Sequence, residues 1–336
     1  MHRLIFWGLL ILVVVLVGLL IDQIFYRIIR LFLAKQTAQI IRLVVFVAVV
    51  LTIGISCYVG HNVTRLQVEV KQVEVPSSKL PASFDGFRVA QISDFHINSF
   101  DVQEDQPFFD NLVSAIKAQH PDLLVFTGDL VTIRSAEAIP FRQALARLTH
   151  ETGVPTYSIL GNHDYAEYMR GFDDQRRHQD VDSLNRLQEE AGWTMLNNAA
   201  TYIYNNVGDS IALVGVENIG EPPFSVYGDL DMAMTAIGGL KGAENTFTML
   251  LSHNPTHWRS EVLPRTDIDL TMSGHTHAMQ LKIGNWTPSK WKYPECMGLY
   301  QEGDRYLYVN TGLGCTGPTI RIGVKPEVTI LTLRKR

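Results

Sequence analysis

Residues 123–129 read LLVFTGD, and residues 155–164 read PTYSILGNHD. Each stretch is a short run of β-favouring residues that ends in a glycine, and the next residue, Asp129 or Asn162, carries an oxygen that can bind a metal. Glycine allows a sharp turn at the end of a strand and a close approach of the backbone to a ligand. Open α/β sheets place their sites at such strand ends. The two stretches therefore predict an α/β fold with a functional centre that includes Asp129 and the cluster 162–164.

Three further polar blocks follow apolar runs elsewhere in the chain. Asp94 and His96 follow the run 87–92, His253 follows 246–251, and His275 and His277 follow 268–272. Helical periodicity at 107–119 and 136–148 alternates with the first strands at the spacing of βαβ units. This alternation predicts a layered α/β fold.

These blocks share the chemistry of a two-metal centre. Carboxylate, amide oxygen and neutral imidazole suit manganese, iron and zinc, whereas a soft thiolate site would need cysteines. Two such ions about 3.5–4 Å apart activate water and hold phosphoryl oxygens. In an extended segment, Asp-x-His and His-x-His project both side chains to one side. One such element alone is weak, but five in one chain, each behind a strand-like run, predict a phosphoesterase centre.

Together, the five blocks resemble the signature of the calcineurin-like metallophosphoesterase superfamily, from about residue 87 to the C-terminus. The resemblance implies a four-layer αββα sandwich and two divalent metal ions, with manganese, zinc and iron as the main candidates. It implies one metal held by Asp94, His96 and His277 and a second held by Asn162, His253 and His275. Asp129 would bridge the two ions.

The resemblance also implies two catalytic residues that bind no metal. His163 would protonate the leaving oxygen or stabilise the charged phosphoryl group, and Asp164 would orient the His163 ring. A narrower similarity to the YkuE-type bacterial branch lies in residues 287–289, 312–314, 317–318, Arg321, residues 326–327 and the membrane segment described next. In that branch two glycines typically follow the last histidine, whereas this chain has Ala278 and Met279, which narrows the space beside the metals.

The N-terminal part of the chain contains two uncharged apolar runs, 4–21 and 43–60, each about long enough to cross a bilayer as a helix. We expect a helical hairpin anchor at 1–62, a linker and edge strand at 63–86, and the metallophosphoesterase domain at 87–336. The connector between the runs is the more basic flank, with Arg27, Arg30, Lys35 and Arg42. The positive-inside tendency then places the connector in the cytoplasm and the catalytic domain outside it, in a multi-pass protein of the cell membrane.

Other features of the sequence concern the possible partners, the cysteines and two stretches rich in aromatic residues. A net charge of -5 gives no reason to expect nucleic acid as a partner, since a protein that binds it would show a basic face. Cys296 and Cys315 are either two free buried thiols or a disulfide outside the cytosol. Residues 165–180 mix tyrosines with arginines, and they read either as a solvated loop or as a flap beside the site. The aromatic stretch 286–300 reads as core packing or as a rim of the cleft. Oligomeric state cannot be read from these features.

The sequence thus predicts a membrane-anchored hydrolase that cleaves a phosphate ester by means of metal-activated hydroxide. The expected ester is either a phosphodiester or a lipid- or envelope-linked phosphate. A diphosphatase acting on a nucleotide-linked acylated sugar at the cytosolic membrane face is one alternative. A non-catalytic binding scaffold with this fold is another, and the complete ligand set together with His163 argues against it.

Overall fold

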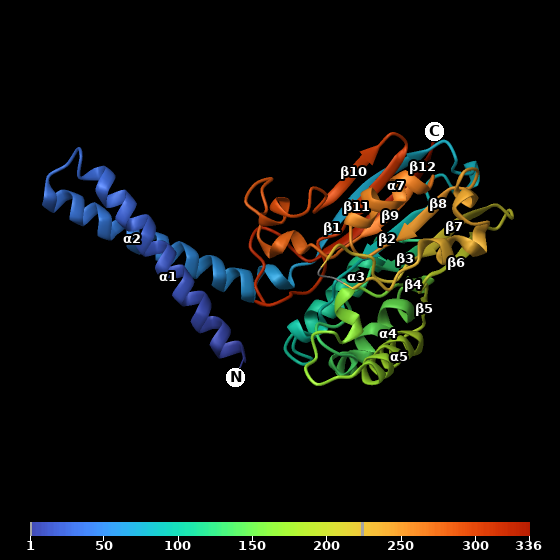
Figure 1. Cartoon of the computed structure of the whole chain (residues 1–336), viewed down its shortest axis with the longest axis horizontal. Coiled ribbons are helices and arrows are strands. Elements are labelled where there is room, and N and C mark those ends of the chain that lie inside the picture. The colour runs from blue at the N-terminus through green and yellow to red at the C-terminus, as the bar shows by residue number, and fades with distance from the viewer. Residues whose placement is uncertain (1, 223–224) are drawn as a thin grey trace.

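The structure is a computed structural model that describes residues 2–222 and 225–336, with side chains described from residue 12 onwards except at position 14. A helical hairpin projects from a body of two β-sheets (Figure 1). The helices are α1 (His2–Ile29), α2 (Lys35–Asn62), α3 (Gln106–Lys117), α4 (Arg142–His150), α5 (Asp174–Glu190), α6 (Leu230–Met234) and α7 (Leu263–Arg265).

Each sheet has six strands. The first has the order β1 (Glu69–Ser77), β12 (Glu327–Lys335), β2 (Arg88–Ile92), β3 (Leu123–Phe126), β4 (Thr156–Ser158) and β5 (Trp193–Met195). The second has the order β10 (Gly298–Glu302), β11 (Arg305–Val309), β9 (Leu270–Ser273), β8 (Thr248–Leu251), β7 (Ser210–Gly215) and β6 (Ala199–Tyr204). Strands β2 to β5 are mutually parallel, as are β7, β8, β9 and β11. Their carboxyl ends carry the polar blocks.

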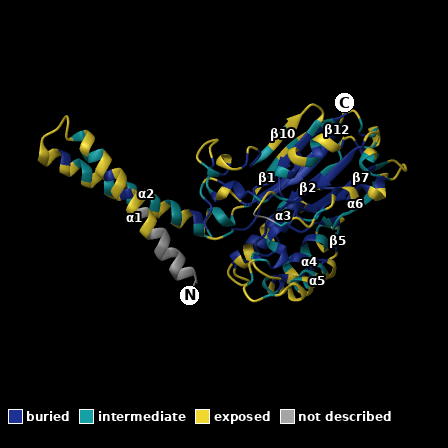
Figure 2. Cartoon of the chain, in the orientation of Figure 1, coloured by how far each residue is buried: buried dark blue, intermediate teal, exposed yellow. Residues whose placement is uncertain are grey.

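Three apolar cores separate four layers. One core lies between the sheets, where Val125 and Leu331 of the first sheet meet Leu213 and Met272 of the second. Another packs α3, α4 and α5 on the outer face of the first sheet, and a third packs α6 and the segment around Trp258 on the outer face of the second. The interior is buried throughout both sheets (Figure 2). This arrangement is the αββα sandwich that the family resemblance implies.

The edge strand expected within residues 63–86 is β1, and it pairs in parallel with β12 over its whole length. Val75, Leu80 and Phe84 are buried in the core between the sheets. Part of the expected linker therefore packs as part of the sandwich. The division into an anchor, a linker and a catalytic domain remains our proposal.

The stretch 165–180, expected as a solvated loop or a flap, is partly helical. Helix α5 begins at Asp174, and the Asp173 side chain accepts the backbone N–H of Arg176 at 2.8 Å. Asp180, in the second turn of this helix, accepts hydrogen bonds from the backbone and hydroxyl of Ser135. Half of the proposed flap is thus the first two turns of a helix.

The hairpin helices α1 and α2 are joined by residues 30–34. Among the residues searched for a membrane span, one helix, Lys35–Leu66, is long and apolar enough to cross a bilayer. Much of the first expected span, 4–21, falls on side chains outside the described part of the chain, so this span is not confirmed. Asp22 of α1 and Arg42 of α2 form an ion pair at 2.5 Å. Cys296 and Cys315 are both buried, free thiols.

Candidate metal centre

The carboxyl ends of β2, β3, β4, β8 and β9 bring all the predicted polar residues to one edge of the two sheets. The loops that follow these strands carry Asp94 and His96, Asp129, Asn162 to Asp164, His253, and His275 and His277 in turn. The backbone joins the loops directly: Asp94 N–H donates to Gly128 O at 2.9 Å, and Gly274 N–H donates to His253 O at 2.9 Å. Blocks that are far apart in the sequence therefore form one site.

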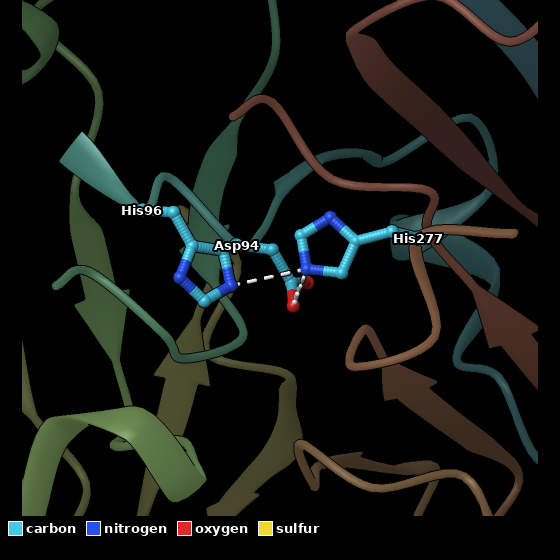
Figure 3. A group of neighbouring side chains, drawn as sticks. All are labelled: Asp94, His96 and His277. Carbon is cyan, nitrogen blue, oxygen red and sulfur yellow. Dashed lines mark hydrogen bonds and ion pairs between the residues drawn. The ribbon is translucent and has the colours of Figure 1, made fainter. Parts of the chain in front are cut away.

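Asp94, His96 and His277 form the first group (Figure 3). Nε2 of His277 lies 3.1 Å from Oδ1 of Asp94 and 3.1 Å from Nε2 of His96. All three side chains are buried. Their three polar atoms converge on one point, as ligands of a single cation do.

Thr132 fixes the tautomer of His96 through the ring nitrogen Nδ1, which points away from the other ligand atoms. The Thr132 hydroxyl donates to Oδ1 of Asn98 at 2.6 Å, and its oxygen lies 3.1 Å from Nδ1 of His96. Because the hydroxyl proton is already used, the hydroxyl oxygen accepts the Nδ1 proton of the imidazole. The lone pair of Nε2 is thereby left facing the centre, which is how an outer residue prepares an imidazole for a metal.

Asp129 lies between the two groups. Its Oδ2 is 3.5 Å from Nε2 of His96 and 3.2 Å from Nε2 of His253, and its Oδ1 accepts the backbone N–H of His163 at 2.8 Å. Asp129, His253 and His275 offer ligand atoms within 4.8 Å of one another, as does the first group. A carboxylate in this position is suited to bridge two ions.

The second group is completed by Asn162. Its Oδ1 lies 2.8 Å from Nδ1 of His275, and its amide donates to the Tyr168 hydroxyl at 3.0 Å. Nδ1 of His253 lies 2.8 Å from the carbonyl of Thr127. A carbonyl only accepts, so Nδ1 donates, and Nε2 of His253 is the nitrogen that faces Asp129.

The backbone at these positions is unusual. Five of the site residues are not glycine and yet have positive φ: Asp94, His96, Asp129, His275 and His277. Such conformations are uncommon for residues other than glycine and gather at functional sites. Glycine is required at Gly161, because a Cβ there would lie 2.3 Å from Oδ1 of Asp129. The loop after β4 can pack this closely on the bridging carboxylate only without a side chain.

The electrostatics suit cations. Burial lowers the pKa of His96 well below its ordinary value and that of His275 to about 3, so both rings are neutral and offer lone pairs. Burial alone would also lower the pKa of His253, but the carboxylates of Asp129 and Asp94 outweigh it and raise this pKa to about 9. Two buried carboxylates thus favour positive charge here.

The buried Nδ1 of His277 has no hydrogen-bond partner among the described residues. This nitrogen and oxygen donor set fits two divalent ions of the manganese, iron and zinc type.

His163 has a position distinct from the two groups, although Asp129, His96 and His163 also lie close enough to share an ion. Nδ1 of His163 donates to the Thr132 carbonyl at 2.7 Å, and its ring lies 4.5 Å from the Tyr168 ring. We expected Asp164 to contact this ring and orient it, and this expectation is wrong. Asp164 instead accepts the backbone N–H groups of Asp129, Val131 and Gly161 at 2.8, 3.1 and 2.9 Å. Burial and the charge of Asp129 raise the pKa of Asp164 to about 7.

The groups open into a cleft of about 340 Å³. Its lining includes His163, His275, Met279, Tyr293, Thr316 and Pro318. The sequence motifs did not point to Thr132, or to Tyr293, whose hydroxyl lies 2.9 Å from Nε2 of His275. The aromatic composition of 286–300 was the signal for Tyr293, and the tyrosines of 165–180 were the signal for Tyr168. Thr132 carries no such signal.

Residues 87–279 match the family model described as Calcineurin-like phosphoesterase. The chain belongs to this family. As a calcineurin-like phosphoesterase it is a metal-binding hydrolase of phosphate esters.

Curated relatives of this phosphoesterase include membrane proteins. The uncharacterized metallophosphoesterase YkuE of Bacillus subtilis is 29% identical over 80% of this chain and 86% of its own length. The "transmembrane protein with metallophosphoesterase domain" of Bos taurus is 29% identical over 79% of this chain and 57% of its own. The UDP-2,3-diacylglucosamine pyrophosphatase LpxG of Chlamydia muridarum is 25% identical over 75% of this chain and 86% of its own.

Proposed function

We propose that this phosphoesterase is anchored in the cell membrane by its N-terminal helices and hydrolyses a phosphate ester presented at the bilayer, either a phosphodiester or a lipid- or envelope-linked phosphate. Asp94, His96 and His277 would hold one ion, Asn162, His253 and His275 the other, and Asp129 would bridge them. The bound ions would supply an activated water and neutralise phosphoryl charge. The donor set suits manganese, zinc or iron, and we do not expect nucleic acid as a partner.

The chain's own residues would orient the ester and move the proton. Nδ1 of His163 is engaged by the Thr132 carbonyl, so Nε2 is the atom that faces a phosphate in the cleft. From there the ring would donate a proton or a hydrogen bond to the leaving oxygen. Tyr293 and Met279 border the space in which the ester group would lie.

The observation that carries the membrane part of the proposal is the contact between α2 and the cleft wall. Backbone N–H of Arg321 donates to Gly60 O at 3.3 Å, and Nδ1 of His61 lies 2.7 Å from Thr319 O. Pro318 and Thr316, in the same segment, line the cleft. The apolar helix therefore ends against the wall of the catalytic cleft, which would hold the cleft close to the bilayer surface.

The first experiment is hydrolysis of a chromogenic phosphodiester and monoester by the full chain in detergent, stripped of metal and resupplied with manganese, zinc or magnesium. Asp129→Asn is the control. We expect metal-dependent turnover that this variant loses. A full chain that binds no metal under these conditions would overturn the two-metal proposal.

The membrane part is tested by comparing soluble and lipid-linked phosphate esters. A Cβ at Gly60 would lie 2.7 Å from Cγ2 of Ile320, whereas a Cβ at Gly54, in the same helix, would meet nothing within 4 Å. We expect Gly60→Val to reduce hydrolysis of the lipid-linked ester more than that of the soluble ester, and Gly54→Val to change neither. No preference for lipid-linked esters in the unaltered chain would remove this part of the proposal.

A diphosphatase acting on a nucleotide-linked acylated sugar is a second candidate, because the name of the Chlamydia muridarum relative describes such an activity. It requires the catalytic domain on the cytosolic face, whereas the basic connector favours the opposite face. Protease accessibility of the C-terminus in right-side-out and inverted vesicles distinguishes the two.

A further inference from the structure

A loop beside the cleft carries apolar side chains that the chain itself does not cover. We call residues 279–293 the tryptophan loop. It leaves the cleft at Met279 and returns to it at Tyr293, since both residues line the cleft. Between them, Trp291 is 81% exposed, Ile283 65% and Trp286 40%, while Met279 is 50% exposed. An exposed apolar cluster next to a site marks a surface that meets an apolar partner.

The tip of the tryptophan loop is a fixed structure. Backbone N–H of Ile283 donates to Trp286 O at 2.9 Å, and N–H of Trp286 donates to Ile283 O at 3.1 Å, which closes a tight turn through Gly284. The rings of Trp286 and Trp291 then pack edge to face with centroids 5.5 Å apart. The two indole rings are thus held together on an exposed loop.

The charge of the loop is opposite to that of the whole chain. Lys282, Lys290 and Lys292 lie within it, and residues 279–294 contain no aspartate or glutamate, whereas the chain carries a net charge of -5. Tryptophan combined with lysine is the composition of segments that lie at the interface of a bilayer. Lysines near such a surface are attracted by anionic lipid head groups.

The loop is also rooted where α2 reaches the globular domain. The carbonyl of Gly60 in α2 accepts the backbone N–H of Arg321 at 3.3 Å, and the next residue, Ile322, is bridged to Leu281 at the start of the loop. Backbone N–H of Lys282 donates to Ile322 O at 2.8 Å. One backbone pairing therefore separates the tryptophan loop from the end of the apolar helix. The loops after β9, orange in Figure 1, lie on the side of the body where α2 joins it.

We propose that the tryptophan loop is a second membrane contact, in which Ile283, Trp286 and Trp291 enter the interface of the anionic bilayer that α2 crosses. The bilayer then meets the mouth of the cleft between Met279 and Tyr293, at the depth of the lipid head groups. This inference rests on the membrane anchoring by α2 in the proposed function, but not on the identity of the ester.

The test uses the full chain reconstituted in vesicles of phosphatidylcholine and phosphatidylglycerol with brominated acyl chains, which quench nearby tryptophan. Trp7→Phe is introduced throughout, and Trp193 and Trp258 are buried and contribute a constant signal. We expect the emission of Trp286 and Trp291 to be quenched by brominated lipid and shielded from aqueous iodide. The matched control replaces both by phenylalanine and adds Tyr204→Trp, an exposed position on β6 at the far edge of the second sheet. In this control we expect iodide to quench the tryptophan emission and brominated lipid to leave it unchanged.

Several results would overturn the proposal. Emission from Trp286 and Trp291 that iodide quenches and brominated lipid does not would place the loop in water. Emission shielded from both quenchers would indicate a protein partner instead of lipid. Co-flotation of the chain with the vesicles reports separately whether the anchor inserts, so a failure of anchoring is distinguished from a failure of the loop. Replacing the three lysines by glutamine should lower quenching in anionic vesicles to its level in neutral ones, and no change would refute the role of charge.

Discussion

Asp164 offers the sharpest test of how the centre is built. Its carboxylate accepts three buried backbone N–H groups, of Asp129, Val131 and Gly161, from the loops that follow β3 and β4. In Asp164→Asn, one oxygen can still accept from Asp129 and Gly161, which share Oδ2, but the new amide group opposes the N–H of Val131. Leaving one buried donor unsatisfied costs about 1–3 kcal/mol. In Asp164→Ala all three donors lose their partner, at about 3 kcal/mol or more.

These variants should also bind metal more weakly, because Asp129 and Asn162 lie on the loops that lose these hydrogen bonds. Outer residues that position ligands typically change metal affinity by about 10–100-fold. We therefore expect Asp164→Asn to lower the stability of the metal-free chain and its affinity for manganese or zinc, as measured by chemical unfolding and by calorimetric titration. His163→Ala should keep metal affinity and lose rate by about 10²–10⁴-fold, as expected for a lost general acid.

A double-mutant cycle decides between this role and the orientation of His163. If Asp164 acted through the His163 ring, Asp164→Asn would add no further loss of rate to His163→Ala, and both variants would bind metal normally. That result would refute the loop-holding role that the hydrogen bonds indicate. Additive losses of rate, with weaker metal binding only where Asp164 is changed, are what we expect.

Three other predictions follow from particular contacts. Asp129→Asn should weaken both ions and abolish turnover, because one carboxylate faces both groups; titration that shows loss of a single ion would contradict the bridge. Thr132→Val removes the acceptor at Nδ1 of His96, so we expect about 10–100-fold weaker binding at one ion, with Thr132→Ser retaining affinity as the control. Burial lowers the pKa of His257 to about 4, so the unfolded chain binds a proton between pH 6.5 and pH 4 that the folded chain does not. Stability should therefore fall by up to about 3 kcal/mol as the pH drops through that range, and His257→Asn should flatten the fall in unfolding free energy against pH.

The residues of the centre were predictable because each follows a strand. Short apolar runs fix where β2, β3, β4, β8 and β9 end, and the polar residue types after them narrow the chemistry. Thr132 could not be found in this way, because it acts through a backbone carbonyl and a hydroxyl whose directions depend on the folded loop. The family resemblance also misplaced the contacts of Asp164, since this carboxylate, next to His163 in sequence, accepts hydrogen bonds from backbone groups of two loops.

The start of α5 was missed for a related reason. Its apolar positions begin only at Val181, followed by Leu184 and Leu187, whereas residues 174–180 carry mostly charged and polar side chains. Apolar periodicity detects the part of a helix that packs on a core, and the first two turns of α5 have little core beneath them. Capping by Asp173 begins the helix, and a lone aspartate among several gives a weak signal.

Helix α2, the cleft wall and His277, a candidate metal ligand, are parts of one continuous set of contacts. Gly60 of α2 bonds to residue 321, and Gln280 ties the same segment to the cleft by donating to the carbonyls of Pro318 and Ile320 at 2.8 and 2.9 Å. Gln280 lies three residues after His277, within the left-handed backbone that runs from His277 to Gln280. A side chain added at Gly60 therefore displaces a segment that holds the His277 loop in place. Helix α2 thus supports the geometry of the catalytic cleft, and in our proposal it would also set the location of the cleft at the bilayer.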